Sequence, residues 1–462
     1  MPSSATPPPI PDAAFQYWSL EPSKFVLDNG LRVMVVERAR SLVVELRFVC
    51  EGGFAADPSG LIGLAGFAMA MFSDGALRAG NASLAVAQES IGAALRGRVT
   101  ADGAVVEIST LAANLDDALT MCVQVLSNPE FTAEDFEAVQ MNRLALIAHE
   151  RLSPFDLSLR VLPPMIHGVD RPYARPLCGS GTEQGVTAVT ADNLRGYYAE
   201  HLAPERGTLV VTGPHRVAEL ITMLEDTFGR WRTSPAVEHL PPAPPPPSVA
   251  ATDPSVRIVD RPHAAQSALV AAVPTVARNS SAFEALMVAN AVLAGTFTSR
   301  LNMSLRESKG WTYGVRSSVL DARYQGLWLI DCSVRHDRTA EAMTEISREI
   351  ENLARDRPCS PDELGHAIDS LVARAPAMYE TCAQIADSLA DVVIYRLPTG
   401  YHRELSARLR RLNPGRITKA CREILAATAL RWMIVGDAAK LIGQLSAGGF
   451  GEIKIIPERE LP

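Results

Sequence analysis

The chain has 462 residues, 47% of them hydrophobic and 21% charged, a globular composition that predicts about two to four domains. Its 44 Lys and Arg against 52 Asp and Glu give a net charge of -8. This balance argues against a phosphate-backbone binder, because such a protein needs a basic face. No stretch approaches about 18 consecutive apolar residues, so the sequence predicts no membrane-spanning helix.

The cysteines and the N-terminal segment bear on the compartment. The seven cysteines are scattered and form no CxxC pair, which argues against a disulfide framework or a zinc knuckle and favours a reducing compartment. Residues 1–21 lack the basic and apolar regions of a signal peptide. We therefore expect a cytoplasmic location, or a periplasmic one if a leader has been removed.

The first elements are two strand patterns, followed by helix patterns. Residues 31–37 and 43–49 are rich in apolar and β-branched side chains and predict strands. An apolar run at 63–71 predicts a buried helix, and residues 115–126 and 136–152 have helical periodicity. Strands followed by helices indicate an α+β fold, in which a mixed, mainly antiparallel sheet packs with helices.

A run of prolines divides the chain into halves of similar length. The consecutive prolines of HLPPAPPPPS at 239–248 cannot donate backbone hydrogen bonds and favour a stiff, extended conformation. We interpret it as a spacer between domains, and a ligand for an SH3-type domain is the alternative. The predicted organisation is an extended segment at 1–21, an N-terminal domain at 22–236, a Pro-rich linker at 237–255 and a C-terminal domain at 256–462.

The two halves resemble each other. Thr190 begins a capped helix that leads to an apolar strand ending in Gly, and Asn413 begins a matching pair of elements over the same number of residues. Thr132 and Ser360 begin a second pair of capped helices at corresponding places. These matches predict an internal duplication, with one homologous domain in each half.

Common catalytic motifs are missing from the sequence. It contains no Walker loop, no GxGxxG after a strand and no GxSxG elbow. Of its nine histidines, no two lie four residues apart, so HExxH and HxxEH helical pairs are also missing. A site assembled from distant histidines stays open.

The segment at 297–315 combines several chemically useful residues. A helix in it is expected to end near Gly310, a natural C-cap, and a strand to begin at Trp311. Arg306 then lies in the last helical turn and Tyr313 just inside the strand. Such a break can aim both polar tips at one spot. The alternative is that Arg306 pairs with a carboxylate and Tyr313 fills an interface.

This segment resembles the C-terminal signature of the M16 (pitrilysin, or inverzincin) metallopeptidases, in which an Arg and a Tyr seven residues apart form a pair. The matching residues here are Arg306 and Tyr313. The family's opening strand, the approach to its zinc helix and its P-Y-x-x-P…G loop have counterparts at 27–33, 52–65 and 171–179. The likeness covers about residues 22–456 and implies two homologous M16-type domains.

The sequence departs from the family at the zinc motif. Catalytic members carry HxxEH directly after Gly-Leu-Ala, whereas residues 66–70 here read Gly-Phe-Ala-Met-Ala. Both histidine ligands and the general-base glutamate are gone. The family's third ligand is a later Glu, with which Glu150 aligns best. One carboxylate cannot hold a zinc ion that needs about three protein ligands. The resemblance therefore implies no cofactor in this chain.

The resemblance implies a non-catalytic subunit of a two-chain zinc metallopeptidase, inactive alone. Its partner would be an HxxEH-bearing M16 subunit that holds the zinc, and the heterodimer would enclose unfolded peptides. Tyr313 would donate to the oxyanion in trans, and Arg306 would hold a substrate carbonyl. The short connection at 294–297 lacks the glycine-rich loop of a mitochondrial processing-peptidase subunit, so presequence recognition is not expected.

Two other functions stay open. The first is an inert scaffold, like the zinc-free core subunits of respiratory complexes. The second is a protein that binds peptides without cleaving them. Retention of Arg306 and Tyr313 argues against the scaffold, because a scaffold has no need of an oxyanion donor. An autonomous metallopeptidase is the least favoured, since its ligands are missing.

Overall fold

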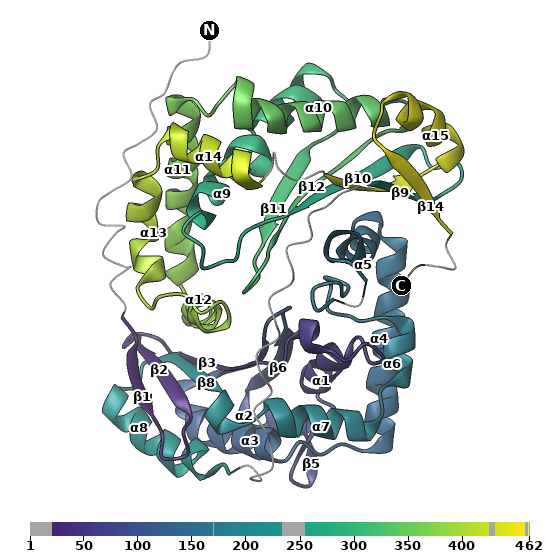
Figure 1. Ribbon diagram of the computed structural model, residues 1–462. Coiled ribbons are helices and arrows are strands. Elements are labelled where there is room, and N and C mark those ends of the chain that lie inside the picture. The colour runs from purple at the N-terminus through teal and green to yellow at the C-terminus, as the bar shows by residue number, and fades with distance from the viewer. Residues whose placement is uncertain (1–20, 170, 233–254, 425–429, 458–460, 462) are drawn as a thin grey trace.

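The computed structural model describes residues 21–169, 171–232, 255–424, 430–457 and 461. Two layered halves lie one above the other, each built on a six-stranded sheet (Figure 1). The predicted Pro-rich linker and N-terminal segment lie almost wholly outside the described residues, so the domain boundaries drawn from them stay predictions. Among the described residues, no helix has the length and apolar character that crossing a membrane requires.

The elements of the N-terminal half are β1 (Ser23–Val26), β2 (Arg32–Glu37), β3 (Val43–Cys50), α1 (Leu64–Ser73), β4 (Arg78–Ala79), β5 (Ala82–Ser83), α2 (Leu84–Ile91), β6 (Ala94–Val99), β7 (Ala104–Leu111), α3 (Leu115–Ser127), α4 (Ala133–Leu152), α5 (Pro154–His167), α6 (Glu183–Ala188), α7 (Ala191–His201), β8 (Thr208–Gly213) and α8 (Val217–Asp226). The elements of the C-terminal half are β9 (Ser255–Asp260), β10 (Gln266–Pro274), α9 (Phe283–Asn290), β11 (Val315–Leu320), β12 (Leu327–Arg335), α10 (Thr339–Glu351), α11 (Pro361–Arg374), α12 (Cys382–Ile394), α13 (Tyr401–Arg410), α14 (Pro414–Ile424), β13 (Arg431–Gly436), α15 (Ala438–Ala447) and β14 (Glu452–Ile456).

The sheets confirm the internal duplication. Their strand orders are β1-β2-β8-β3-β7-β6 and, read from the matching edge, β14-β9-β13-β10-β12-β11. The parallel pair β2–β8 corresponds to β9–β13, and the antiparallel strands beyond each pair correspond one to one. Only the outer edge differs, because β1 pairs antiparallel with β2 whereas β14 pairs parallel with β9. Both sheets are mixed and mainly antiparallel, as predicted.

Local capping explains where the matching helices begin. Thr132 and Asp135 exchange side-chain and backbone hydrogen bonds at the start of α4, and Ser360 and Glu363 do the same at the start of α11. Each capping box satisfies backbone N–H groups that have no partner within the helix. The predicted strands at 31–37 and 43–49 are β2 and β3, and the predicted buried helix at 63–71 is α1.

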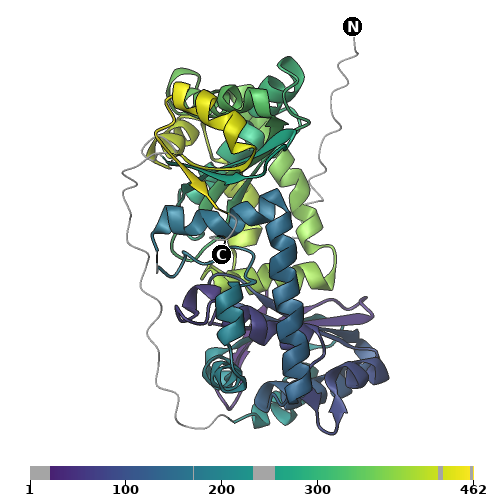
Figure 2. The same ribbon diagram turned by 90° about the vertical axis from the view of Figure 1, so that its right-hand side faces the viewer.

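The two halves exchange a helix. Helix α5 of the N-terminal half packs on the C-terminal sheet, where Leu157 and Leu162 contact a cluster that includes Val270. Helix α12 of the C-terminal half packs in the same way on β3 and β8 of the N-terminal sheet. Figures 1 and 2 both show α5 beneath the C-terminal sheet. Each sheet therefore has one face covered by the other half of the chain.

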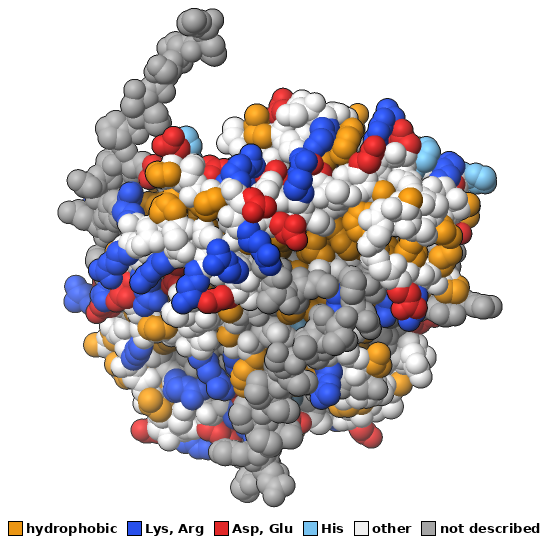
Figure 3. All heavy atoms as spheres, turned by 45° about the horizontal axis from the view of Figure 1, so that its top comes forward, with side chains coloured by type: hydrophobic (Ala, Val, Ile, Leu, Met, Phe, Trp, Pro, Cys, Tyr) orange, Lys and Arg blue, Asp and Glu red, His pale blue; other side chains and the backbone are white. Residues whose placement is uncertain are grey.

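Charged side chains of both signs are interspersed on the surface shown in Figure 3. Exposed ion pairs, such as that of Arg195 with Asp192 on α7, contribute about 0–1 kcal/mol each. A few ion pairs are buried instead. The pair of Arg160 with Glu150 is the extreme case, because the Arg160 side chain is fully inaccessible to solvent.

Candidate functional site

Arg306 lies in the last part of a helical segment that ends with a π-helical stretch at Asn302–Ser308. Its guanidinium carbon lies 3.3 Å from the ring centroid of Phe297, and its Nη2 lies 2.7 Å from a carboxylate oxygen of Glu307. The side chain is 13% exposed. A cation–π contact and a salt bridge thus hold the guanidinium in place at the surface.

Tyr313 is the most exposed of the large apolar or aromatic side chains described, at 94%. It lies between Gly310, which has the left-handed φ of 61° of a helix C-cap, and β11. The helix ends where the sequence predicted, but the strand begins at Val315 and not at Trp311. The prediction that Tyr313 lies inside the strand is therefore wrong, and it lies in the connecting loop.

Arg306 and Tyr313 are close in sequence, but they do not bond to each other. Among the described residues, no hydrogen bond or ring contact joins the two side chains. The guanidinium of Arg306 faces Phe297 and Glu307, whereas the Tyr313 ring projects into solvent. In the chain alone, Arg306 is thus held by its own neighbours and Tyr313 stands apart from it.

Asn302 explains why the strand starts late. Its amide nitrogen donates to the carbonyl oxygen of Val315 at 3.0 Å, and the Val315 N–H donates to its amide oxygen at 2.9 Å. The Asn302 side chain is buried and also donates to the carbonyl oxygen of Thr296. One side chain thus satisfies both backbone groups of the first strand residue, and the loop with Tyr313 is held at its base.

Substituting Asn302 by Leu is expected to lower the free energy of unfolding by about 2–3 kcal/mol, because two buried backbone groups of Val315 lose their partner. Amide hydrogen exchange at Val315 should accelerate. Asn142→Leu, at an exposed position on α4, is the matched control and should change stability by less than about 0.5 kcal/mol. Unchanged exchange at Val315 would show that the loop is held by other contacts.

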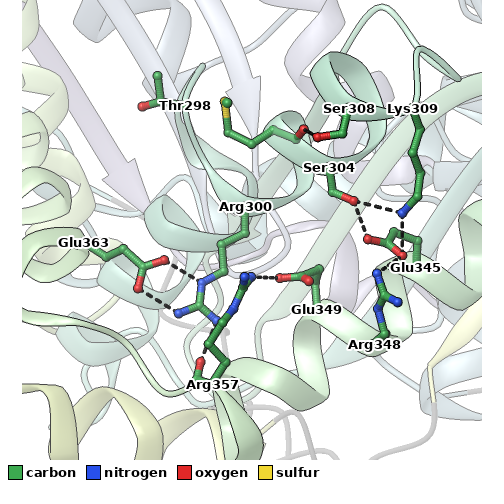
Figure 4. Close-up of a pocket in the computed structure, with 11 residues that line it drawn as sticks. Thr298, Arg300, Ser304, Ser308, Lys309, Glu345, Arg348, Glu349, Arg357 and Glu363 are labelled. Carbon is green, nitrogen blue, oxygen red and sulfur yellow. Dashed lines mark hydrogen bonds and ion pairs between the residues drawn. The ribbon is translucent and has the colours of Figure 1, made fainter.

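A pocket of about 430 Å³ lies under this helical segment. Figure 4 shows Arg300 pointing toward Glu363, and Lys309 toward Ser304 and Glu345. Burial opposes ionisation of Glu363, but hydrogen bonds from Arg300 and Ser360 outweigh burial and lower its pKa to about 2. The charges that line the pocket are therefore paired with one another. They anchor the segment to α10 and α11.

The hairpin that follows Tyr313 is fastened to the N-terminal half. At its tip, the Arg323 N–H donates to a carboxylate oxygen of Asp102 at 2.7 Å, and the Arg323 guanidinium pairs with Glu51 at 2.9 Å. Tyr173 also donates a hydrogen bond to Asp102. The strand after the Tyr313 loop is thus fixed at its start by Asn302 and at its end by the other half of the molecule.

The residues at the zinc positions of the M16 family do not fit a zinc ion in this chain. Gly66 has no side chain, and Met69 is buried in the core of α1. A Cβ added to Gly66 would lie 2.2 Å from the carbonyl oxygen of Gly179 and 2.7 Å from Nη2 of Arg143. Space for a ligand is therefore taken by backbone and by a guanidinium.

Glu150, the residue that aligns with the third zinc ligand, is already bound. Nη1 of Arg160 donates to its Oε2 at 2.6 Å, and so does the hydroxyl of Ser180, also at 2.6 Å. Burial is the main cause that lowers the pKa of Arg160, and Glu150 opposes that effect. Among the described residues, no three His, Cys, Asp or Glu side chains are grouped to hold a metal. We derive no chemistry through a metal in this chain.

Sequence reasoning missed Arg143, Arg160 and Asn302. Arg143 and Glu150 are seven residues apart on α4 and so lie on one face, which is the only signal in the sequence that links them. Nothing in the sequence indicated that Arg160, from the next helix, would meet Glu150. The bidentate role of Asn302 also depends on a contact between a helix and a strand.

Comparison with known proteins gives a consistent result. Residues 188–371 match the sequence model of the "Peptidase M16 inactive domain". An uncharacterized zinc protease of Mycobacterium leprae is 26% identical over 248 residues, which make up 53% of this chain and 54% of that protein. The chain thus spans a little over half the length of the curated relatives it matches.

Solved structures agree along most of the chain. The crystal structure of a peptidase M16 inactive domain from Pseudomonas fluorescens has a TM-score of 0.80 and 20% identity, and the match covers 90% of this chain and 98% of that one. A protease from Helicobacter pylori also has a TM-score of 0.80, with 15% identity over 90% of this chain and 99% of that one. Residues 188–371 are therefore similar to the M16 inactive domain, and the chain shares its fold with these two solved structures along 90% of its length.

Proposed function

We propose that this chain is the non-catalytic subunit of a zinc metallopeptidase. It pairs with an M16 subunit that carries HxxEH and the zinc ion, and the heterodimer encloses unfolded peptides. One observation carries the proposal. The chain presents Tyr313 at 94% exposure and holds Arg306, seven residues earlier, against Phe297 and Glu307, while its own zinc positions are filled by Gly66, Arg143 and their neighbours.

Arg306 and Tyr313 have complementary roles in peptide hydrolysis. Attack of water on a peptide carbonyl creates a tetrahedral oxyanion, which donors placed beforehand stabilise. The Tyr313 hydroxyl donates a hydrogen bond to that oxyanion in the partner's site. The guanidinium of Arg306 is permanently charged and donates to a neighbouring carbonyl of the peptide, which positions it. Both residues act in trans, and this chain holds no cofactor.

The second candidate is an inert scaffold or a peptide-binding protein. The observation that favours it is the salt bridge of Arg306 with Glu307, because a guanidinium held by its own chain has fewer donors left for a peptide. This candidate does not explain the exposure of Tyr313, because a buried or polar residue at this position would serve a scaffold as well.

The test is hydrolysis of a random peptide pool by this chain alone, by the HxxEH chain that copurifies with it, and by the mixture. We expect activity only in the mixture. Equal activity of the HxxEH chain with and without this chain would refute a trans-acting role. The lack of any copurifying HxxEH chain would favour the scaffold or the peptide-binding protein.

A further inference from the structure

The buried ion pair near α1 joins three elements that are distant in sequence. Glu150 is on α4 and Arg160 on α5, and Ser180 belongs to the loop before α6. Nη1 of Arg160 donates to Glu150 at 2.6 Å and to the Ser180 hydroxyl at 2.7 Å, and Nη2 donates to the carbonyl oxygen of Gly181 at 2.7 Å. The side chains of Arg160 and Glu150 are 0% and 9% exposed.

Arg143 binds the same loop from the other side. Its Nη2 donates to the carbonyl oxygen of Gly179 at 2.9 Å, next to Gly66 of α1. Burial lowers the pKa of Arg143, and the negative charge of Glu150 is the largest of the effects that oppose this. Arg160 thus pairs directly with the buried carboxylate of Glu150, and both guanidiniums hold the backbone of the loop at 179–181.

The loop and α1 then meet backbone to backbone. A Cβ added to Gly181 would lie 2.3 Å from the Cα of Gly63, and the Thr182 N–H donates to the carbonyl oxygen of Ile62 at 3.0 Å. Gly63 and Gly181 both have positive φ, at 116° and 88°. Only glycine allows such an approach at these conformations. The space beside the zinc positions is closed by this contact.

We propose that Arg143, Glu150, Arg160 and Ser180 form a guanidinium lock that takes the place of a metal ion at this site. The lock neutralises Glu150 and fastens the loop to α1, so that the N-terminal half folds without metal. This inference concerns the chain by itself and does not rest on the proposed trans-acting function.

The compensation of charge at Glu150 supports the proposal that guanidiniums take the place of a metal ion. A zinc ion would compensate the negative charge of Glu150, and here the Arg160 guanidinium does so through a direct ion pair at 2.6 Å. A buried carboxylate without a compensating charge is costly, so loss of the metal ligands requires either loss of the carboxylate or a new cation. Here Glu150 is present, and the cation that pairs with it is Arg160 of α5.

The lock is tested by a double-mutant cycle on the full-length chain. Arg160→Met removes the charge but keeps much of the volume, and it should raise the unfolding equilibrium constant at least about 100-fold because the buried Glu150 carboxylate loses its ion pair. Glu150→Gln should cost less. The unfolding equilibrium constant of the double variant should be at least about tenfold lower than that of Arg160→Met, because Glu150 no longer carries a charge.

Arg195→Met is the control, because it breaks an exposed pair and should change the constant less than about fivefold. If Arg160→Met does not fold, recovery of a folded chain in the double variant gives the same answer. Additive effects of the two substitutions would overturn the lock.

Zinc binding is the second measurement. The triple variant Gly66→His/Met69→Glu/Ala70→His restores the family motif, and Ala70→His alone leaves the contact at Gly66 untouched. After incubation with Zn²⁺ and dialysis, neither is expected to retain stoichiometric zinc, and a chelator should not shift the melting temperature of the unmodified chain. One zinc per folded variant chain, or melting of the unmodified chain by the chelator, would overturn the proposal.

Discussion

Substitution of Tyr313 by Phe is expected to lower the turnover of the two-chain complex about 100- to 1,000-fold. The change removes one hydroxyl from a ring that is 94% exposed, so the fold of this chain should not respond. Arg306→Ala should also reduce turnover, because it removes the guanidinium that stacks on Phe297. Steady-state hydrolysis of a fluorogenic peptide by the reconstituted complex measures both effects.

The control for these variants is Arg316→Ala. Arg316 is on β11, its side chain is 75% exposed, and it pairs with Asp331. It has the same charge as Arg306 and lies ten residues after it, but it has no proposed contact with substrate, so turnover should be unchanged. Size-exclusion chromatography of each complex reports assembly. Loss of assembly in the Tyr313 or Arg306 variants would assign the segment to the interface and not to the chemistry.

Leu162→Ala is expected to have the largest effect on stability. Leu162 is on α5, is fully buried and packs in the cluster that α5 forms with the C-terminal sheet. Truncation of a buried Leu costs about 2–5 kcal/mol, because apolar burial is lost and a cavity is left. Since each sheet is covered by a helix of the other half, we expect both halves to unfold in one transition at a lower temperature.

Differential scanning calorimetry checks this expectation. Leu152→Ala is the matched control, because Leu152 ends the preceding helix and is 67% exposed. That variant should shift the free energy of unfolding by less than about 0.5 kcal/mol. Two separate transitions, with only one shifted in Leu162→Ala, would show that the exchanged helices do not couple the halves.

Features that depend on neighbours in sequence were predictable. Capping boxes at Thr132 and Ser360 mark helix starts because the hydrogen bonds span only three residues. Apolar and β-branched residues identified β2 and β3, an apolar run identified α1, and the repetition of local signals predicted two homologous domains. The replacement of the zinc motif at 66–70 is also visible directly in the sequence. The spacing of Arg306 and Tyr313 is visible as well, whereas their catalytic role stays a prediction.

Only the tertiary structure shows which side chains occupy the former zinc positions and which contacts fix the Tyr313 loop. Arg160 meets Glu150 only because α4 and α5 form a corner, and Arg143 meets Gly179 only because a glycine loop approaches α1. The late start of β11 depends on Asn302, thirteen residues before Val315. Such contacts join groups across elements, and their energy depends on burial and exact separation. Local propensity carries no information about either, so the packed fold determined them.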